Sequence, residues 1–373
     1  MDALMLPLNW QRVRLGDIGK PCMCKRVMKH QTTRYGEIPF YKIGTFGNTA
    51  DAFISKKLFL EYKTKYSFPK KGDILISASG TIGKAVIYDG KPAYFQDSNI
   101  VWIDNDETLV KNDFLFYAYS NVKWNTEHTT ILRLYNDNFR NTLIPLPPLN
   151  EQSAIANVLS GLDRYLCALD ALILKKESVK KALSFELLNQ RKRLKGFNQA
   201  WQRVRLGDIA NYLTSNLSVE QITQQGEIKV YDVNNFIGYT DTTFISDKPY
   251  ISIVKDGSVG RVRILPPKTN ILSTMGALIA NHRTTTEFLF YLLSNFDFKN
   301  FTSGSIIPHI YFKDYKEKTI FLPPLNEQSA IANILGTLDN EIASLKNKKR
   351  QFENIKKALN HDLMSAKIRV LEK

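Results

Sequence analysis

The sequence predicts an α+β fold, in which two mixed α/β domains are separated by a long antiparallel two-helix coiled coil in an internally duplicated, pseudo-twofold chain. Two observations predict it. Two blocks of sequence each occur twice, and a heptad repeat of apolar residues follows the second block in both copies. With 373 residues, 43% of them apolar, the chain is long enough for two domains that each have a core.

The repeated blocks form a constant frame around a divergent insert. Residues 10–18 (WQRVRLGDI) recur unchanged at 201–209, and residues 146–157 (LPPLNEQSAIAN) recur unchanged at 322–333. The offsets are 191 and 176 residues, so the insert is 15 residues shorter in the second copy. A duplicated scaffold with no functional meaning would not explain why the frame stayed the same while the inserts diverged. The pattern therefore indicates inserts that each recognise something different.

A long helix is predicted after each insert. Pro147 and Pro148 cannot lie inside a helix, and Asn150 just beyond them is a good N-cap. Apolar residues then follow a 3-4 spacing, interrupted by lysines such as Lys176 and Lys180. The seam runs from Ile155 to Leu194 in the first copy, and from Ile331 to Val370 in the second. A helix of about 45 residues is roughly 65 Å long, so its predicted role is to set a distance.

The short connection between the copies predicts how the helices pair. Helix one is expected to end near Leu194, and residues 195–200 separate it from the second frame. The second domain must then lie at the far end of helix one, and helix two can pair with helix one only by running back. The predicted divisions are a first domain at 1–148, helix one at 149–195, a second domain at 196–324 and helix two at 325–373.

The inserts have the pattern of mixed α/β structure. In the first, strands are predicted at 71–77 and 84–88 around a glycine turn at 80–83, followed by a short aromatic helix at 114–117. In the second, strands are predicted at 250–254 and 261–264 around a turn at 257–260, followed by a helix at 288–291.

Composition narrows the partners and the compartment. The formal net charge is +15, which points first to nucleic acid and second to an anionic membrane surface. No apolar run is long enough to cross a bilayer, and the N-terminal residues lack the pattern of a secretory signal. Three cysteines (Cys22, Cys24 and Cys167) favour a reducing compartment, hence the cytoplasm, and the spacing of the first two does not suit zinc.

The sequence has no recognisable catalytic constellation. The segment Ser79-Gly80-Thr81-Ile82-Gly83-Lys84 superficially suggests a phosphate loop, but Ala85 follows the lysine where serine or threonine is needed. It is interpreted as a glycine turn between two strands, with Lys84 and its counterpart Arg261 contacting DNA phosphates as a second possibility. The histidines are too scattered for a ligand set, so no metal or cofactor is predicted, and any chemistry belongs to a partner.

The order of the motifs along the chain resembles that of a known family. Trp-x-x-Val-x-Leu-Gly-Asp-Ile, an insert with Gly-Asp-Ile-Leu-Ile-Ser and Gly-Thr-Ile-Gly-Lys, and then Pro-Leu-Pro-Pro-Leu-x-Glu-Gln before a long helix occur in this order. This arrangement resembles the DNA specificity (S) subunit of Type I restriction-modification systems, over essentially the whole chain. The second copy departs from the pattern at 250–254, where Gly-Asp-Ile-Leu is missing.

The resemblance implies a non-catalytic DNA-binding subunit. Each insert would be a target recognition domain for one half of a split, asymmetric sequence, and the helix pair would set the gap. Two modification subunits would dock on the repeated frames and carry S-adenosylmethionine and adenine methylation. Restriction subunits would add ATP-driven translocation and cleavage. The subunit itself would bind no cofactor.

Two sets of site residues are predicted within that framework. Residues near the turns and in the loops before each long helix are expected to contact DNA: Thr81, Lys84, Arg133, Tyr135, Asn136, Ser258, Arg261, His309, Tyr311 and Lys313. The unchanged helix starts are expected to contact the modification subunits: Leu149, Asn150, Glu151, Gln152, Leu325, Asn326, Glu327 and Gln328. Glu151 and Glu327 are expected to be surface residues that can be changed without harm to the fold, although a pure packing role for these segments remains open.

Two other classes of function fit less of the sequence. One is a non-catalytic structural or interaction protein that uses a basic coiled coil as a spacer, which titration with bipartite DNA duplexes would distinguish. The other is a nuclease or methyltransferase complete in one chain, which a methylation assay on the isolated chain would test.

A matched pair of insertions tests the predicted spacer. Four residues inserted after Ala171, with four after the equivalent Asn347, add about 6 Å and slightly more than one helical turn. Because base pairs rise about 3.4 Å, the half-sites should move apart by roughly one to two base pairs, with both half-sequences unchanged. Mapping of methylated sites in cells measures the gap. An active enzyme that keeps its original gap would contradict the role of the helices as spacer.

Overall fold

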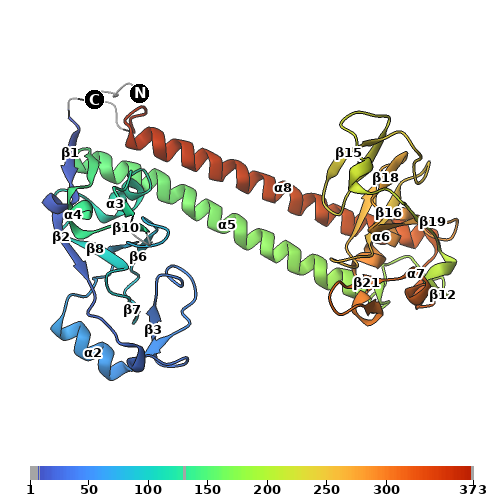
Figure 1. Ribbon diagram of the computed structural model, residues 1–373, viewed down its shortest axis with the longest axis horizontal. Coiled ribbons are helices and arrows are strands. Elements are labelled where there is room, and N and C mark those ends of the chain that lie inside the picture. Colours follow the sequence, from blue (N-terminus) through green and yellow to red (C-terminus); the bar gives the residue numbers. More distant parts are fainter. Residues whose placement is uncertain (1–6, 8, 129–131, 371–373) are drawn as a thin grey trace. The chain divides into compact units, whose positions relative to one another are not determined.

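The computed structural model describes residues 7, 9–128 and 132–370, and the chain divides into two units (Figure 1). Unit 1 comprises Met1–Leu169 and Lys348–Lys373, and unit 2 comprises Asp170–Asn347. Each unit thus holds one insert with its frame and one stretch of each long helix. The mixture of helices and strands in both units confirms the predicted α+β class.

Unit 1 is built on a four-stranded and a three-stranded sheet. The four-stranded sheet has the order β2-β8-β5-β6, the three-stranded sheet β4-β3-β7, and β1-β11 and β9-β10 form two-stranded ribbons. Its elements are β1 (Gln11–Arg14), α1 (Leu15–Ile18), β2 (Gly19–Met23), η1 (Lys29–Gln31), β3 (Ile38–Tyr41), β4 (Phe53–Ile54), α2 (Lys56–Lys65), β5 (Ile74–Ser77), β6 (Ala85–Ile87), β7 (Tyr94–Phe95), β8 (Ile100–Asn105), α3 (Asn112–Tyr119), β9 (Glu127–His128), β10 (Leu132–Arg133), α4 (Asn136–Asn141), β11 (Leu143–Leu146) and the first part of α5 (Leu149–Leu188).

Unit 2 repeats this arrangement. Its sheets have the orders β13-β19-β16-β17 and β15-β14-β18, with ribbons β12-β22 and β20-β21. Its elements are β12 (Gln202–Arg205), η2 (Leu206–Asp208), β13 (Ala210–Thr214), η3 (Val219–Gln221), β14 (Ile228–Tyr231), β15 (Phe236–Thr240), β16 (Tyr250–Val254), β17 (Val262–Leu265), β18 (Thr269–Ile271), β19 (Met275–Ala280), α6 (Thr286–Ser294), η4 (Phe298–Phe301), β20 (Thr302–Ser303), β21 (His309–Ile310), α7 (Phe312–Tyr315), β22 (Thr319–Leu322) and the first part of α8 (Leu325–Met364).

The two inserts therefore share one topology although their sequences diverge. In each, the outer ladder β2–β8 or β13–β19 is antiparallel, and one parallel pair, β3–β7 or β14–β18, completes the smaller sheet. The departure of the second copy at Tyr250–Val254 leaves the strand in place, because β16 is fully buried and its apolar side chains are what the central strand needs. The sequence difference is thus one of side chains and not of backbone course.

The main core of each unit lies between the four-stranded sheet and the helices. In unit 1 the aromatic helix α3 packs Phe114 and Leu115 against Ile76 of the sheet and Ile155 of α5. A second core, around Tyr94 and Trp102, joins the other face of the sheet to β3, β4 and β7. Figure 1 shows that α2 and β3 lie on the side of the sheet away from α5.

In each unit a stretch of α5 runs antiparallel to a stretch of α8. In unit 1, Tyr165 of α5 meets Phe352 of α8 with ring centroids 4.7 Å apart. In unit 2, Lys176 bonds to Glu341 at 2.9 Å and Lys180 to Asp339 at 2.5 Å. The lysines that interrupt the apolar seam are therefore partners in ion pairs between the helices.

A repeated cluster of three side chains fixes the aromatic helix to the helix pair. In unit 2 the Tyr291 hydroxyl donates to Asp339 Oδ2 at 2.8 Å, and Lys180 bonds to the other carboxylate oxygen. In unit 1, Tyr117 donates to Asp163 Oδ2 at 2.8 Å, and Lys356 bonds to Oδ1. Three elements meet on one carboxylate in each unit, so the domain has a fixed register on the helices.

Both long helices end earlier than the sequence predicted. α5 ends at Leu188, not near Leu194, and α8 ends at Met364. Gln190 and Ala366 have φ values of 58° and 57°, and the next amide donates back to Glu186 O and Asp362 O, respectively. This is a Schellman cap, which closes a helix with one left-handed residue even when that residue is not glycine. The cap was missed because neither copy has glycine or proline at this position.

A buried carboxylate stands at the start of each long helix. Glu151 accepts a hydrogen bond from Trp10 Nε1 at 3.0 Å and two from the Arg369 guanidinium, at 2.5 and 2.8 Å. Glu327 accepts the same bonds from Trp201 Nε1 at 3.0 Å and from Arg193 at 3.2 and 2.6 Å. The cluster joins the first frame block, the second frame block and the end of the other helix.

The glutamine beside each glutamate ties down three backbone segments. Gln152 Nε2 donates to the carbonyls of Pro147 and Leu109, and its Oε1 accepts from the amide of Lys111. Gln328 makes the equivalent bonds to Pro323, Arg283 and Thr285. Each glutamine thereby holds the start of the aromatic helix next to the start of the long helix.

The expectation that Glu151 and Glu327 are surface residues is wrong. Their exposed fractions are 2% and 0%, and Gln152 and Gln328 are both fully buried. A buried charge needs partners that complete its hydrogen bonds, and the tryptophan and arginine supply them. Packing therefore explains why these four residues are the same in both copies.

Among the described residues, no helix combines the length and apolar character needed to cross a membrane.

Removal of the buried carboxylate should destabilise the unit that contains it. Glu151→Ala and Glu327→Ala each leave a buried indole N–H without its acceptor, which costs about 1–3 kcal/mol of unfolding free energy. Urea denaturation followed by tryptophan fluorescence measures the loss.

Glu317→Ala is the matched control, because that glutamate forms an exposed pair with Arg205 and its loss should change stability by less than about 0.5 kcal/mol. Equal losses of stability from the three substitutions would contradict the role assigned to the two buried glutamates.

Candidate nucleic-acid interface

In unit 1 a turn and a hairpin from distant parts of the chain form one edge. Residues 78–84 connect the antiparallel strands β5 and β6, and the turn depends on Gly80 and Gly83, with φ values of 65° and 83°. The hairpin β9–β10 follows about fifty residues later. Leu134 donates its amide to the Ala78 carbonyl at 2.9 Å, and Ser79 forms a β-bridge with Arg133. Thr81 and Arg133 are therefore brought to the same edge.

Unit 2 builds the same edge from its own residues. The turn 255–261 connects β16 and β17, and the hairpin β20–β21 lies beside it. Ile310 donates its amide to the Lys255 carbonyl at 2.9 Å, Gly257 donates to Pro308 O at 2.9 Å, and Asp256 forms a β-bridge with His309. We call these two arrangements, residues 78–84 with 127–128 and 132–136, and residues 255–261 with 302–313, the recognition edges.

The structure exposes nine of the ten residues predicted to contact DNA and half-buries the tenth, His309. The aromatic side chains Tyr135 and Tyr311 are 41% and 50% exposed. All ten are thus accessible to a ligand. They come from the turn and from the hairpin with the residues that follow it.

The two cations after the turns are already engaged within their units. Lys84 Nζ donates to the Phe46 carbonyl at 2.5 Å, and Arg261 donates to Asn234 Oδ1 at 2.8 Å. Each bond ties the turn to a loop that follows a strand of the smaller sheet, β3 in unit 1 and β14 in unit 2. A DNA phosphate would have to compete with these acceptors, so Lys84 and Arg261 position the turn in this structure.

A carboxylate orients the histidine of the second edge. His309 Nδ1 lies 2.6 Å from Asp256 Oδ1, and Lys255 lies 3.2 Å from Oδ2. Burial raises the pKa of Asp256, but the hydrogen bonds from His309 and Lys255 outweigh it and leave the pKa below its usual value. Asp256 is therefore ionised at neutral pH. Its bond occupies Nδ1, so a ligand would meet the other ring nitrogen, Nε2.

Aromatic and cationic side chains continue this edge. The rings of His309 and Tyr311 are nearly parallel, with centroids 6.5 Å apart. Lys313 Nζ lies 5.5 Å from the Tyr311 ring centroid, within cation–π range. The edge thus combines polar groups that can read a base with a charge that can meet a phosphate.

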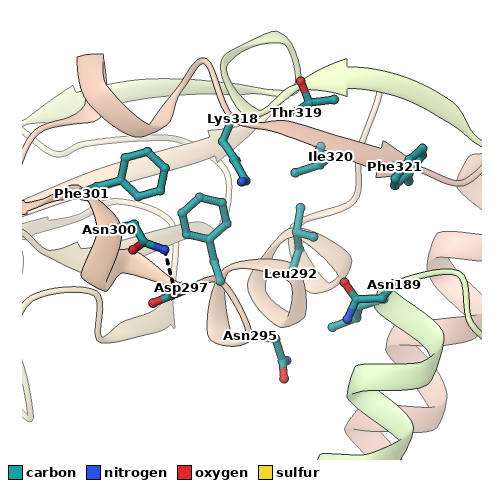
Figure 2. Close-up of a pocket in the computed structure, with 12 residues that line it drawn as sticks. Asn189, Leu292, Asn295, Asp297, Asn300, Phe301, Lys318, Thr319, Ile320 and Phe321 are labelled. Carbon is teal, nitrogen blue, oxygen red and sulfur yellow. Dashed lines mark hydrogen bonds between the residues drawn. The ribbon is translucent and has the colours of Figure 1, made fainter.

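A pocket in unit 2 lies apart from these residues. It has a volume of about 420 Å³ and lies between the end of α6, η4 and β22. Figure 2 shows Phe301, Ile320 and Leu292 around it, with the amide of Asn300 bonded to Asp297 at 3.0 Å. None of the ten predicted residues lines it, so the recognition edge and not this pocket is the candidate interface. In the described part of the chain, no group of histidines, cysteines and carboxylates is arranged to hold a metal ion.

Sequence reasoning missed the residues that position the edges. Arg193, Arg369 and the Tyr–Asp–Lys clusters were not singled out, because the segments that carry them diverge outside the two identical blocks. A signal was present, since Arg193 and Arg369 obey the same 176-residue offset as the second block.

Comparisons with known proteins agree with the duplicated architecture. A sequence model of the Type I restriction modification DNA specificity domain matches residues 7–177 and again residues 198–354. A putative Type I restriction enzyme specificity subunit of Haemophilus influenzae is 62% identical over 152 residues, which are 40% of this chain and 40% of that protein. A Type I restriction enzyme specificity subunit of Methanocaldococcus jannaschii is 24% identical over 99% of this chain and 95% of its own length.

Two solved structures share the fold. The S subunit of a Type I restriction-modification system from M. genitalium has a TM-score of 0.64 at 19% identity, covering 96% of this chain and 98% of that one. A chain from a structure on complex assembly and conformational transition of the Type I restriction-modification system has a TM-score of 0.57 at 16% identity, with coverage of 96% and 98%.

Proposed function

The chain belongs to the family of Type I restriction-modification DNA specificity proteins, and we propose that it reads a split, asymmetric DNA target with one half-site for each unit. It is a non-catalytic specificity subunit, because members of this family leave the chemistry to other subunits. Residues 1–148 and 196–324 are assigned as the target recognition domains, and 149–195 and 325–373 as the spacer.

The observation that carries this proposal is the pair of recognition edges. The same backbone scaffold presents different side chains: Thr81 and Arg133 in unit 1 correspond to Ser258 and His309 in unit 2. Two domains that recognised the same half-site would need the same side chains at these positions. A constant scaffold with different accessible side chains at corresponding positions is what two different half-sites require.

The chemistry of the edges suits separate roles. The Arg133 guanidinium can donate two parallel bonds to guanine in the major groove, which is the commonest specific contact to a base. His309 and Asn136 offer one or two polar atoms each for other base edges. Lys313 and the overall positive charge serve the phosphates, which supply affinity without sequence information.

A second repeated surface suits docking of two copies of one partner. The buried Glu–Gln pair cannot serve, but the outer face of each helix start carries exposed residues that are the same in both copies. These are Leu149, Asn150, Ser153 and Asn157 on α5, and Leu325, Asn326, Ser329 and Asn333 on α8. We call them the docking faces. Hydrogen bonds within the helix starts account for the identity of Asn150, Ser153, Asn326 and Ser329. The exposed Leu149 and Asn157, with Leu325 and Asn333, are the positions whose identity one partner bound twice would require.

The partners proposed for these faces are two modification subunits. They would carry S-adenosylmethionine and methylate adenine, and restriction subunits would add ATP-dependent translocation and cleavage. The three cysteines are free, which suits assembly in the reducing cytoplasm.

Each recognition edge should govern only its own half-site. Arg133→Ala should relax base preference by about 1–3 kcal/mol at one position of one half-site, and His309→Ala should affect only the other half-site. Binding of the assembled methyltransferase to duplexes with every single base change measures both effects.

Lys65→Ala is a charge-matched control for Arg133, because Lys65 is an exposed lysine of α2 paired with Glu61. It should leave every base preference unchanged. Equal loss at both half-sites after Arg133→Ala would show that the assignment is wrong.

Changes at the docking faces should alter the number of bound partners. Asn157→Arg introduces a large charge on one face and should reduce the bound modification subunits from two to one, and Asn157→Arg with Asn333→Arg should leave none. Native mass spectrometry counts the subunits. The control is Asn48→Arg, an exposed asparagine of the first insert, which should keep both partners. Unchanged assembly of the double variant would remove the docking faces from the proposal.

A further inference from the structure

Two exposed isoleucines form the tip of the hairpin β20–β21. Ile306 is 92% exposed and Ile307 is 54% exposed, and Ile306 is the most exposed large apolar side chain in the part of the chain that the structure describes. A single exposed apolar residue is common on protein surfaces and needs no explanation. Two neighbouring exposed apolar residues at the tip of a loop indicate a contact surface. The tip belongs to the second recognition edge and extends it beyond the residues that the sequence pointed to.

The tip is held in place at both ends. Gly304 has a φ of 91°, and a Cβ atom there would lie 2.3 Å from the Ile307 carbonyl oxygen, so this position requires glycine. At the other end, the Pro308 carbonyl accepts a bond from Gly257 of the turn at 2.9 Å. The isoleucines are therefore presented by a loop that the unit itself keeps in shape.

The surroundings of the tip point to DNA as the occupant. On the same hairpin His309 follows the tip after Pro308, and Tyr311 and Lys313 lie just beyond the hairpin. Lys255 lies on the adjoining turn but is paired with Asp256, so Lys313 is the cation next to the tip that can meet a phosphate. A tip next to Lys313 and to groups that can read a base suits a polyanion, whereas a purely apolar protein interface would exclude this charge.

Isoleucine limits what the tip can read. It has no hydrogen-bonding group, and the one apolar group that the major groove offers is the C5 methyl of thymine. A two-stranded ribbon fits the major groove, which is about 12 Å wide, better than the minor groove of about 6 Å. The tip of such a ribbon can reach the base edges while His309 at its base contacts the same groove.

We propose that Ile306 and Ile307 contact thymine methyl groups in the half-site read by unit 2. This inference rests on the proposed function and adds an apolar reader to it. The 176-residue offset places Thr130 and Ile131 at the corresponding sequence positions of the first copy, so the copies differ at the first position and both have isoleucine at the second.

Replacement of thymine by deoxyuridine tests the contact, because it removes only the methyl group. The probe is a duplex that carries the bipartite site methylated in cells, with each thymine of either half-site replaced in turn. Loss of one buried methyl group should weaken binding of the assembled methyltransferase about fourfold, at one or two positions of one half-site. The variant Ile306→Ala/Ile307→Ala should bind the thymine and deoxyuridine duplexes equally well.

Three further variants sharpen the test. Gly304→Ala should lose the same discrimination, because it displaces the tip. Lys313→Ala should weaken binding to both duplexes and lower the salt dependence by about one phosphate contact, but keep the discrimination. Val219→Ala changes a 65% exposed aliphatic residue outside the hairpin and should have no effect.

Several results would overturn the inference while the proposed function stands. In one, the wild-type complex binds every deoxyuridine duplex as well as the thymine duplex, or the half-site read by unit 2 contains no thymine. In another, the double isoleucine variant still distinguishes thymine from deoxyuridine, or it loses its partner subunits in place of this discrimination. A rise in 2-aminopurine fluorescence that depends on the isoleucines would show a wedge between base pairs in place of methyl contact. A wild-type complex without preference for the bipartite site would instead contradict the proposed function.

Discussion

The buried carboxylate at the start of each long helix is the interaction on which the rest of the structure depends. Glu151 and Glu327 are removed from water, so each needs donors that remain in place. The donors come from parts of the chain that are far apart in sequence, a tryptophan before the insert and an arginine after the end of the other helix. One charge therefore joins the two ends of an insert to the spacer, and only a chain that keeps all three residues in both copies can build the cluster twice.

That requirement explains why the frame is constant while the inserts vary. The tryptophan, glutamate and glutamine of the frame are fixed by buried hydrogen bonds, whose loss costs more than most surface changes. The edges of the inserts face outward and carry no such constraint. Selection on recognition can thus change Arg133 in one copy and His309 in the other, while the backbone topology stays the same.

Each recognition edge is a binding surface assembled from elements that are unstable on their own. Neither the glycine turn nor the short hairpin is long enough to be stable alone. Backbone bonds such as Leu134 to Ala78 and Ile310 to Lys255 join the two, and Lys84 and Arg261 tie the turn to loops of the smaller sheet. Rigid support of this kind lets a loop present base-reading groups without a large entropic cost on binding.

The sequence by itself determined the duplication, the helix starts and the class of the inserts, because identical blocks, prolines and heptad spacing are local signals. It also pointed to the exposed residues of both edges, since polar loop residues beside a glycine turn are seldom buried. Only the structure showed the role of Glu151 and Glu327, the exposure of Ile306, and the helix caps at Gln190 and Ala366. The caps are local, but they place residues other than glycine in the left-handed conformation, which no residue type signals. The partners of Glu151 and Glu327 lie more than a hundred positions away, and no local pattern reports which distant side chain will complete a hydrogen bond.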